Sequence, residues 1–143
     1  MRDRIFVDTN ILVYSLLENN SQKHNQTVNL MESLKGDYIF ISTQVLNELY
    51  VALLKHEIDE TEIENKIKKI ISIYNISIPN ITTIRLSWGI KRKYAFSYWD
   101  SLIIASALES NCSILYTEDM QDGRVIENKL RIANPFAAKK TMK

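Results

Sequence analysis

Four acidic residues of this 143-residue chain stand where the ends of expected strands meet the beginnings of expected helices. They are Asp8, Glu48, Asp100 and Asp119. Asp8 and Asp119 each follow a short apolar run that is typical of a buried strand, whereas Glu48 and Asp100 lie in the first two turns of helices. In a parallel sheet wrapped by helices, these positions share the carboxyl edge of the sheet, where ligands bind. One edge of the fold could therefore gather all of these carboxylates.

Carboxylates that lie within a few ångströms of one another repel, and the repulsion raises one or more of their pKa values. Such a cluster is unfavourable unless a cation neutralises it. Ligand sets made only of oxygen suit hard ions, so Mg²⁺ or Mn²⁺ is the natural occupant. These ions lower the pKa of bound water and neutralise charge on a phosphate in its transition state. The reaction that fits the cluster is phosphodiester hydrolysis.

Each acid also has a purely structural interpretation. Asp8 follows a strand and could simply cap a helix. Asp100 stands three residues after Ser97, which is the spacing of a capping box. Glu48 has no capping role; it borders an apolar helix face on which an acid is rarely buried without a partner, and its structural alternative is a position at the edge of the surface. The position of all the acids at one edge, rather than any single acid, is what indicates a site.

Asp119 is preceded by a second acid, Glu118. Adjacent side chains in an extended chain point in opposite directions. At most one of the two is therefore expected to enter the site, and a solvated turn is the structural alternative for both.

The hydrophobic pattern alternates between strands and helices along the chain. Strands are predicted over residues 5–7, 38–41, 76–78, 112–116 and 130–133. Helices are predicted over residues 11–17, 21–35, 43–56, 58–74, 81–96, 98–109 and 123–129. This alternation implies an α/β fold with a central parallel sheet. Residues 1–136 are expected to form one domain, and residues 137–143 a disordered tail.

Composition excludes several classes of protein. Apolar residues make up 45% of the chain and charged residues 24%, which are ordinary values for a globular protein. One cysteine, Cys112, and two histidines provide neither a disulfide framework nor a cysteine-rich zinc site. The net charge of +1 argues against a protein that coats nucleic acid non-specifically. Because the sequence has no apolar run of about 18 residues and no leader-like start, we expect no membrane contact and a cytoplasmic location.

Two further kinds of cluster could contact a nucleic acid. Basic residues at 66, 68 and 69 and at 91–93 could bind phosphates, although such clusters more often form solvated helix faces. Aromatic residues crowd the segment before Asp100, namely Tyr94, Phe96, Tyr98 and Trp99. They could stack on bases, although packing in the core or at a dimer interface is the more frequent role of such residues.

Nearly the whole chain, from Ile5 to Phe136, resembles the PIN-domain family. Four segments carry the resemblance, and each contains one of the four acids. They are 6–14 (FVDTNILVY), 42–50 (STQVLNELY), 97–108 (SYWDSLIIASAL) and 115–123 (LYTEDMQDG), and they are followed by 130–136 (LRIANPF). Together they are similar to the small bacterial and archaeal branch of VapC-type toxins.

The resemblance implies a three-layer α/β/α sandwich and a ribonuclease that depends on Mg²⁺ or Mn²⁺. It assigns metal ligation to three of the acids, Asp8, Asp100 and Asp119. Glu48 would complete the catalytic set, and Asn10 and Thr117 would hold the carboxylates in place. Relatives commonly form homodimers, and the toxins among them are neutralised by an antitoxin protein encoded beside them.

Three functions are compatible with these residues. The first is an endoribonuclease that hydrolyses RNA phosphodiester bonds, the toxin of a type II toxin–antitoxin pair. The second is a PIN-like module that binds RNA or a protein partner with weak or no catalysis. Many relatives carry a basic residue at the position of Glu118. An extra acid there could weaken the approach of RNA, which favours this second function, or it could substitute as a ligand. The third is an enzyme that becomes phosphorylated on Asp8, but that chemistry usually needs a second acid at the position of Asn10.

Overall fold

The computed structural model describes residues 2–137, in which six strands form one sheet. The strands are β1 (Arg4–Val7), β2 (Tyr38–Ser42), β3 (Asn75–Ser77), β4 (Ile114–Tyr116), β5 (Val125–Ile126) and β6 (Leu130–Ala133). Their order across the sheet is β3-β2-β1-β4-β6-β5, and every neighbouring pair is parallel except β5 and β6. The parallel strands therefore end along one edge of the sheet, with β1 and β4 at its centre.

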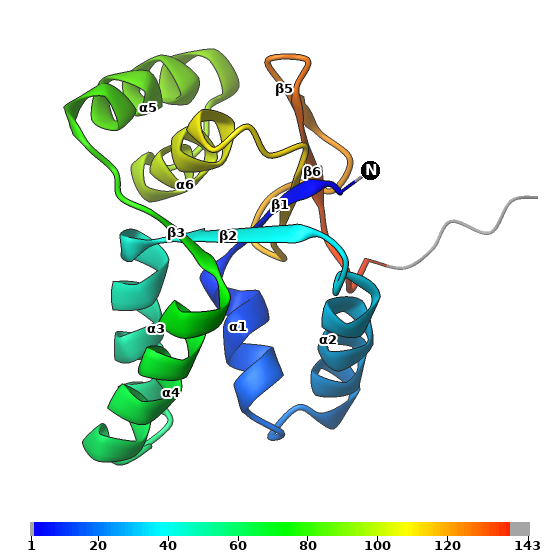
Figure 1. Ribbon diagram of the computed structural model, residues 1–143. Helices are drawn as coiled ribbons and strands as arrows, with labels where there is room; N and C mark the ends of the chain where they lie inside the picture. Colours follow the sequence, from blue (N-terminus) through cyan, green and yellow to red (C-terminus); the bar gives the residue numbers. More distant parts are fainter. Residues whose placement is uncertain (1, 138–143) are drawn as a thin grey trace, which may run out of the picture.

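Helices cover both faces of the sheet (Figure 1). They are α1 (Thr9–Leu16), α2 (Ser21–Ser33), α3 (Thr43–Lys55), α4 (Glu60–Ile73), α5 (Ile81–Tyr94) and α6 (Tyr98–Glu109). α5 and α6 pack together on one face, and α1 to α4 lie on the other. This arrangement confirms the predicted fold class, a three-layer α/β/α sandwich, around a sheet in which every strand is parallel except the edge strand β5.

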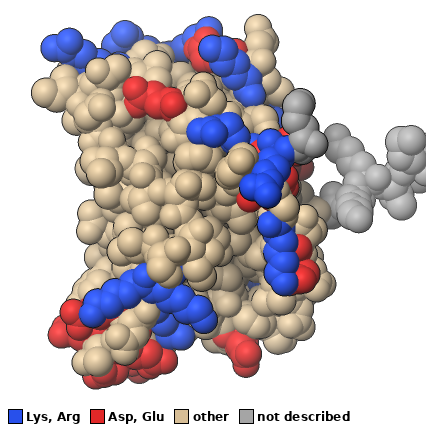
Figure 2. Space-filling model, in the orientation of Figure 1, with Lys and Arg blue, Asp and Glu red and all other residues tan. Residues whose placement is uncertain are grey.

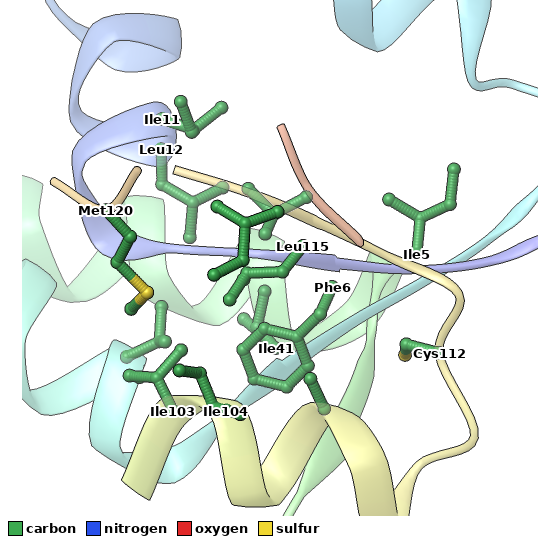
Figure 3. Packing of buried hydrophobic residues seen from close by; sticks show 14 of the residues in the cluster. Ile5, Phe6, Ile11, Leu12, Ile41, Ile103, Ile104, Cys112, Leu115 and Met120 are labelled. Carbon is green, nitrogen blue, oxygen red and sulfur yellow. The ribbon is translucent and has the colours of Figure 1, made fainter. Parts of the chain in front are cut away.

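The central strand is buried on both of its faces. In β1, Ile5, Phe6 and Val7 are at most 1% exposed. Figure 3 shows Ile11 of α1 on one side of this strand and Ile104 of α6 on the other. A strand covered on both faces needs a continuous apolar run rather than an alternating one, and that run is what identified the strand in the sequence.

Polar caps fix the helices that begin at the carboxyl edge of the sheet. Asp8 caps α1, Ser42 caps α3 and Ser97 caps α6, each by accepting a backbone N–H of the first turn with its side chain. Such a cap satisfies a donor that the helix cannot pair internally. α1 and α3 begin directly after β1 and β2, so their first turns lie at the edge where those strands end.

The prediction of a helix over residues 123–129 is wrong. These residues contain β5 and a tight turn that leads back into β6. Lys129 N–H donates to the Ile126 carbonyl oxygen at 3.0 Å across the turn, and both central residues, Glu127 and Asn128, have positive φ angles of 52° and 53°. Turns of this kind are usually marked by Asn-Gly or Asp-Gly. Glu-Asn carries no such signal, so the hairpin was not recognisable.

The remaining elements agree with the predicted ones to within a few residues. α6 spans the predicted residues 98–109, and α4 begins two residues later than expected, after the cap residue Asp59. None of the helices within residues 2–137 is long and apolar enough to cross a bilayer. Apart from Ala137, the tail predicted over residues 137–143 lies outside the described residues.

Candidate functional site

Asp8 directly follows β1, and its side chain is buried, only 4% exposed. Its carboxylate accepts hydrogen bonds from the Thr9 backbone N–H at 2.7 Å and from Thr117 Oγ1 at 2.8 Å. Burial raises the pKa of Asp8 to about 7; the two hydrogen bonds oppose this rise, and the charges of Glu48 and Asp119 add to it. The residue therefore caps α1 and also carries a carboxyl group that ionises near neutral pH.

Glu48 lies in the second turn of α3, and two hydrogen bonds hold its carboxylate. Thr9 Oγ1 donates to one oxygen at 3.0 Å, and Gln44 Nε2 donates to the other at 2.8 Å. The same Gln44 amide donates to the Trp99 carbonyl oxygen at 3.2 Å, at the beginning of α6. Gln44 thereby ties Glu48 to the helix that carries Asp100.

Asp100 is half-buried in the first turn of α6. Its backbone N–H donates to Ser97 Oγ at 3.2 Å, whereas the return bond to the Ser97 N–H that completes a capping box does not form in the described part of the chain. Burial raises the pKa of Asp100; Ser97 opposes this rise, and the charges of Asp119 and Glu48 add to it. The Asp100 carboxylate is thus not committed to a capping box, and it belongs to the same electrostatic cluster.

Asn10 and Thr117 connect Asp8 with Asp119. Asn10 Nδ2 donates to Asp119 Oδ2 at 2.9 Å. Thr117 Oγ1 accepts the Asp119 backbone N–H at 3.1 Å and donates to Asp8 Oδ2 at 2.8 Å. Two neutral side chains therefore hold the beginning of α1 against the segment that follows β4.

Glu118 turns away from Asp119, its neighbour in the chain. Tyr14 Oη donates to the Glu118 carboxylate at 2.6 Å, and Lys23 Nζ forms a salt bridge with it at 2.7 Å. Lys23 Nζ also lies over the rings of Tyr14 and Phe136, 5.1 and 5.2 Å from their centroids. We call Tyr14, Lys23 and Glu118 the α1–α2 clamp. It compensates the negative charge of Glu118 and leaves Asp119 as the acid of this pair that contacts Asn10.

The four predicted acids form one electrostatic cluster without converging on a point. Asp8 and Asp100 both experience the negative charges of Glu48 and Asp119. In the described chain, residues 2–137, no three acidic, histidine or cysteine side chains lie close enough together to hold one metal ion as they stand.

The chemistry of this donor set nevertheless fits a hard divalent cation. All of its charged groups are carboxylates, and none of the ion pairs found within residues 2–137 involves them. Uncompensated oxygen ligands of this kind suit Mg²⁺ or Mn²⁺. Ligation would require the carboxylates to approach one another by side-chain rotation.

The sequence did not identify Thr9 and Gln44, the two residues that fix Glu48. Gln44 precedes Glu48 by four residues on a helix, so the two side chains lie on one face; this spacing is a signal that could have revealed the contact. Thr9 comes from another element, and its hydrogen bond to Glu48 spans 39 residues of sequence. No local pattern marks such a contact.

Two hollows of about 500 Å³ each open beside the cluster, and Glu48 lines both. The first includes Asn10, His56 and Asp119 in its wall, and the second includes Trp99. Glu48 therefore stands between two open depressions, and Asp119 lies in the wall of one of them. Such a surface suits an extended polymer that crosses the cluster better than a small molecule enclosed in one cavity.

Solved structures of similar fold include components of toxin–antitoxin pairs. A chain of a toxin–antitoxin complex from Klebsiella pneumoniae is 20% identical, with a TM-score of 0.71 over 94% of this chain and 99% of that one. A chain of VapBC2 from Rickettsia felis, solved with a DNA fragment from its promoter, is 22% identical, with a TM-score of 0.67 over 92% and 99%. VapC20 from Mycobacterium tuberculosis, described as a sarcin–ricin loop cleaving toxin, is 16% identical, with a TM-score of 0.68 over 80% and 91%.

These identities are too low to transfer an activity, and they establish the likeness of fold alone. No protein of curated function matches the chain. The family model described as PIN domain matches residues 5–125, which contain all four acids and both residues that connect Asp8 with Asp119. The resemblance found in the sequence motifs is thereby confirmed, and the chain belongs to the PIN domain family.

Proposed function

We propose that this protein is a metal-dependent endoribonuclease and the toxin of a toxin–antitoxin pair. The observation that carries the proposal is the cluster of four carboxylates from four separate segments, in which burial and, to a smaller extent, the neighbouring negative charges raise the pKa values of Asp8 and Asp100. A buried carboxylate placed beside other negative charges destabilises a fold, so the position of Asp8 in this cluster favours a role in cation binding and catalysis. Among proteins of similar fold, VapC20 is described as cleaving the sarcin–ricin loop, which supports RNA as the substrate.

In the proposed mechanism, Asp8, Asp100 and Asp119 hold a divalent cation, and Glu48 completes the site. When bound, Mg²⁺ or Mn²⁺ supplies an activated water and neutralises charge on the phosphate. Thr117 and Asn10 keep Asp8 and Asp119 oriented towards each other, through the hydrogen bonds described above.

In this mechanism, Glu48 positions the attacking water. Thr9 and Gln44 fix its two carboxylate oxygens, and the fixed carboxylate orients the water for in-line attack on phosphorus. The bond from phosphorus to the 3′-oxygen breaks, which leaves a 5′-phosphate and a 3′-hydroxyl. No side chain of the protein acts as a nucleophile.

We further propose an antitoxin protein as a partner and a homodimer as the assembly. Chains of similar fold come from the toxin–antitoxin complexes of Klebsiella pneumoniae and Rickettsia felis, which supports the first partner. The homodimer follows from the resemblance to PIN-domain relatives. Val51 and Leu54 on α3 are 51% and 41% exposed and offer apolar surface for a contact between copies.

Cleavage of single-stranded RNA by purified protein tests the function. We expect cleavage with Mg²⁺ or Mn²⁺, none with chelator, and loss of at least about 100-fold in Asp8→Asn and Asp100→Asn, because each removes a charge that the cation needs. Glu109→Gln, an exposed acid at the other end of α6, is the matched control and should retain activity. A 2′,3′-cyclic phosphate product would contradict the mechanism, since it requires attack by the ribose hydroxyl.

The second candidate is a PIN-like module that binds RNA or a protein without turnover. The observation in its favour is that no three of the acids, as they stand, are close enough to hold a metal ion within residues 2–137. Glu118 favours this candidate only weakly, because Lys23 compensates its charge. RNA binding in chelator combined with no cleavage of any RNA in Mg²⁺ or Mn²⁺ would favour this candidate over the nuclease.

A further inference from the structure

The second hollow beside the acids has a wall of unusual composition. It opens between the first turns of α3 and α6 and the segment before α5, with a volume of about 500 Å³. Trp99 lies in this wall with 64% of its surface exposed, which is a large apolar area for a side chain left in contact with solvent. Glu48 lies in the same wall, so the hollow is continuous with the acidic cluster.

The other side chains of the hollow are neutral. Leu102 and Pro79 add apolar surface to that of Trp99, and Thr43 and Asn47 add hydrogen-bonding groups. Glu48 supplies the one charge in this wall, and it is negative. A phosphate would find no positive charge here, whereas a flat, neutral group with polar edges would find both an aromatic face and hydrogen-bond partners. A nucleobase has these properties.

Gln44 holds the tryptophan main chain next to the acids. Its amide nitrogen donates to the Trp99 carbonyl oxygen at 3.2 Å and to Glu48 at 2.8 Å. Its Oε1 is buried and has no hydrogen-bond partner in the described part of the molecule. The Trp99 ring also meets the Tyr98 ring edge-on, with centroids 5.1 Å apart. The aromatic surface is thus ordered by its neighbours before any ligand arrives, which reduces the entropy lost on binding.

We propose that this hollow is a nucleobase subsite, in which an unpaired base next to the cleaved phosphodiester stacks on Trp99 and presents its edge to Thr43 and Asn47. The inference rests on the proposed function, because the RNA substrate supplies the base. It makes Trp99 a determinant of substrate binding, and it makes paired RNA a poor substrate, since a base in a duplex is not free to stack on the indole.

The main competitor for the hollow is a second copy of this chain. Ile78 and Ile81 flank Pro79 in the sequence and are 73% and 69% exposed. Figure 2 shows that the middle of this face, over β2, β3 and the segment that leads to α5, carries almost no charged side chains. The base is favoured because the hollow itself contains Glu48 and neutral polar groups, whereas the centre of an interface is depleted of charge.

Tryptophan fluorescence tests the subsite without any need for cleavage. The chain has two tryptophans, so Trp88→Phe leaves Trp99 as the single reporter. This variant is titrated in chelator with a short single-stranded oligouridylate and with the same oligomer lacking its bases. We expect saturable quenching by the first and none by the second. Equal quenching by the abasic oligomer, or no quenching by either, overturns the subsite.

Steady-state kinetics provides the second readout. Trp99→Ala should raise the KM for oligouridylate about 5- to 100-fold with little change in kcat, because stacking on an aromatic ring contributes to binding rather than to the chemical step. Trp99→Phe should restore most of the affinity, and Trp88→Ala, at an exposed tryptophan of α5, should leave KM unchanged. An unchanged KM in Trp99→Ala, in a wild type that cleaves RNA, overturns the subsite and leaves the nuclease standing.

Two further outcomes separate the subsite from the nuclease and from the dimer. Base-dependent quenching in a wild type that cleaves no RNA would support the subsite and refute the nuclease. If light scattering shows that Trp99→Ala dissociates a dimer while no base-dependent quenching is seen, the hollow is an interface between copies and the subsite is refuted.

Discussion

At the scale of single residues, two opposing effects act on the ionisation of Asp8: burial disfavours its charged form, and hydrogen bonds favour it. Its position at the end of β1 buries the carboxylate, and burial disfavours the charged form. Thr9 and Thr117 offset part of this penalty by donating hydrogen bonds, but no positive side chain in the described structure forms an ion pair with it. The ionised form of Asp8 is therefore one that a divalent cation would stabilise and that the fold alone disfavours.

The raised pKa of Asp8 predicts how stability depends on pH. Between about pH 4 and pH 7 the folded protein holds a proton on Asp8 that the unfolded chain releases, so the free energy of unfolding should fall as pH rises through this window. Below the window both states are protonated, and above it both are ionised. Unfolding in denaturant with chelator, measured from pH 4 to pH 8, reports this dependence.

Asp8→Asn provides the control for this pH dependence, because asparagine keeps the capping oxygen and cannot ionise. The stability of the variant relative to wild type should increase from pH 4 to pH 7 and then stay constant, with about 4 kcal/mol as the upper limit set by the shift from 3.8 to about 7. A difference between the two proteins that is independent of pH would show that Asp8 has an ordinary pKa.

At the scale of secondary-structure elements, the link between α5 and α6 is strained. Ala95 ends α5 in the left-handed conformation, with φ 62° and ψ 33°. An L-residue with a Cβ is disfavoured there by roughly 1–2 kcal/mol, whereas glycine is not. The short link between α5 and α6, which carries Ser97, therefore contains a strained backbone conformation at Ala95.

Ala95→Gly should stabilise the protein by about 0.5–1 kcal/mol, since relief of the left-handed strain exceeds the greater entropy of glycine in the unfolded chain. The melting temperature should rise by about 2–3 °C for a chain of this size. Ala52→Gly, in the interior of α3, is the matched substitution with the opposite expectation, a loss of about 1 kcal/mol. A fall in melting temperature for both variants would refute the strain at Ala95.

The α1–α2 clamp predicts a second effect that acts through an element. The Glu118 backbone N–H donates to Asn10 Oδ1 at 3.2 Å. The segment that carries Asp119 is therefore held both by the backbone of Glu118 and, through the clamp, by its side chain. Removing the carboxylate with Glu118→Gln should loosen this segment and weaken Mn²⁺ binding about 10-fold, as outer-sphere substitutions commonly do. Isothermal titration with Mn²⁺ measures the change.

Glu127→Gln is the control for the clamp. Glu127 directly follows β5 and also forms a salt bridge with a lysine, Lys93 of α5. The Mn²⁺ affinity of this variant should equal that of wild type. If Glu118→Gln instead binds Mn²⁺ more tightly, Glu118 repels the cation from nearby, and the clamp does not serve to position Asp119.

Sequence patterns predicted the elements whose signals are local. The cap residue Ser97 and the apolar segment after it predicted the bounds of α6, and the apolar run of β1 predicted the central strand. The hairpin was not predicted because its turn needs a positive φ angle at Glu127, a residue type that rarely adopts one, and has no glycine after Asn128. The acids of the site could be found through their places at strand and helix ends. The Thr9–Glu48 and Lys23–Glu118 contacts could not, because each joins residues far apart in the chain.

At the scale of the whole molecule, strand order decides which acids meet. β1 and β4 pair at the centre of the sheet, with Val7 opposite Tyr116, so Asp8 and the segment of Asp119 leave the sheet side by side. α3 and α6 approach from opposite faces of the sheet and bring Glu48 and Asp100 to the same edge. Four segments of one chain thus concentrate negative charge in a protein whose net charge is only +1.

This concentration of charge predicts that divalent cations stabilise the whole fold. Each ion that binds the folded chain and not the unfolded one should add roughly 1.4–2.7 kcal/mol at 10–100 times its Kd, or about 3–11 °C in melting temperature. Thermal melts at pH 8 in chelator, Mg²⁺ and Mn²⁺ measure this shift without knowledge of the RNA. Asp100→Asn should abolish it, and Asp122→Asn, whose side chain instead accepts the Asn134 N–H, should retain it. An equal shift in Asp100→Asn would place the cation elsewhere, and no shift in wild type at millimolar ion would favour the binding module over the nuclease.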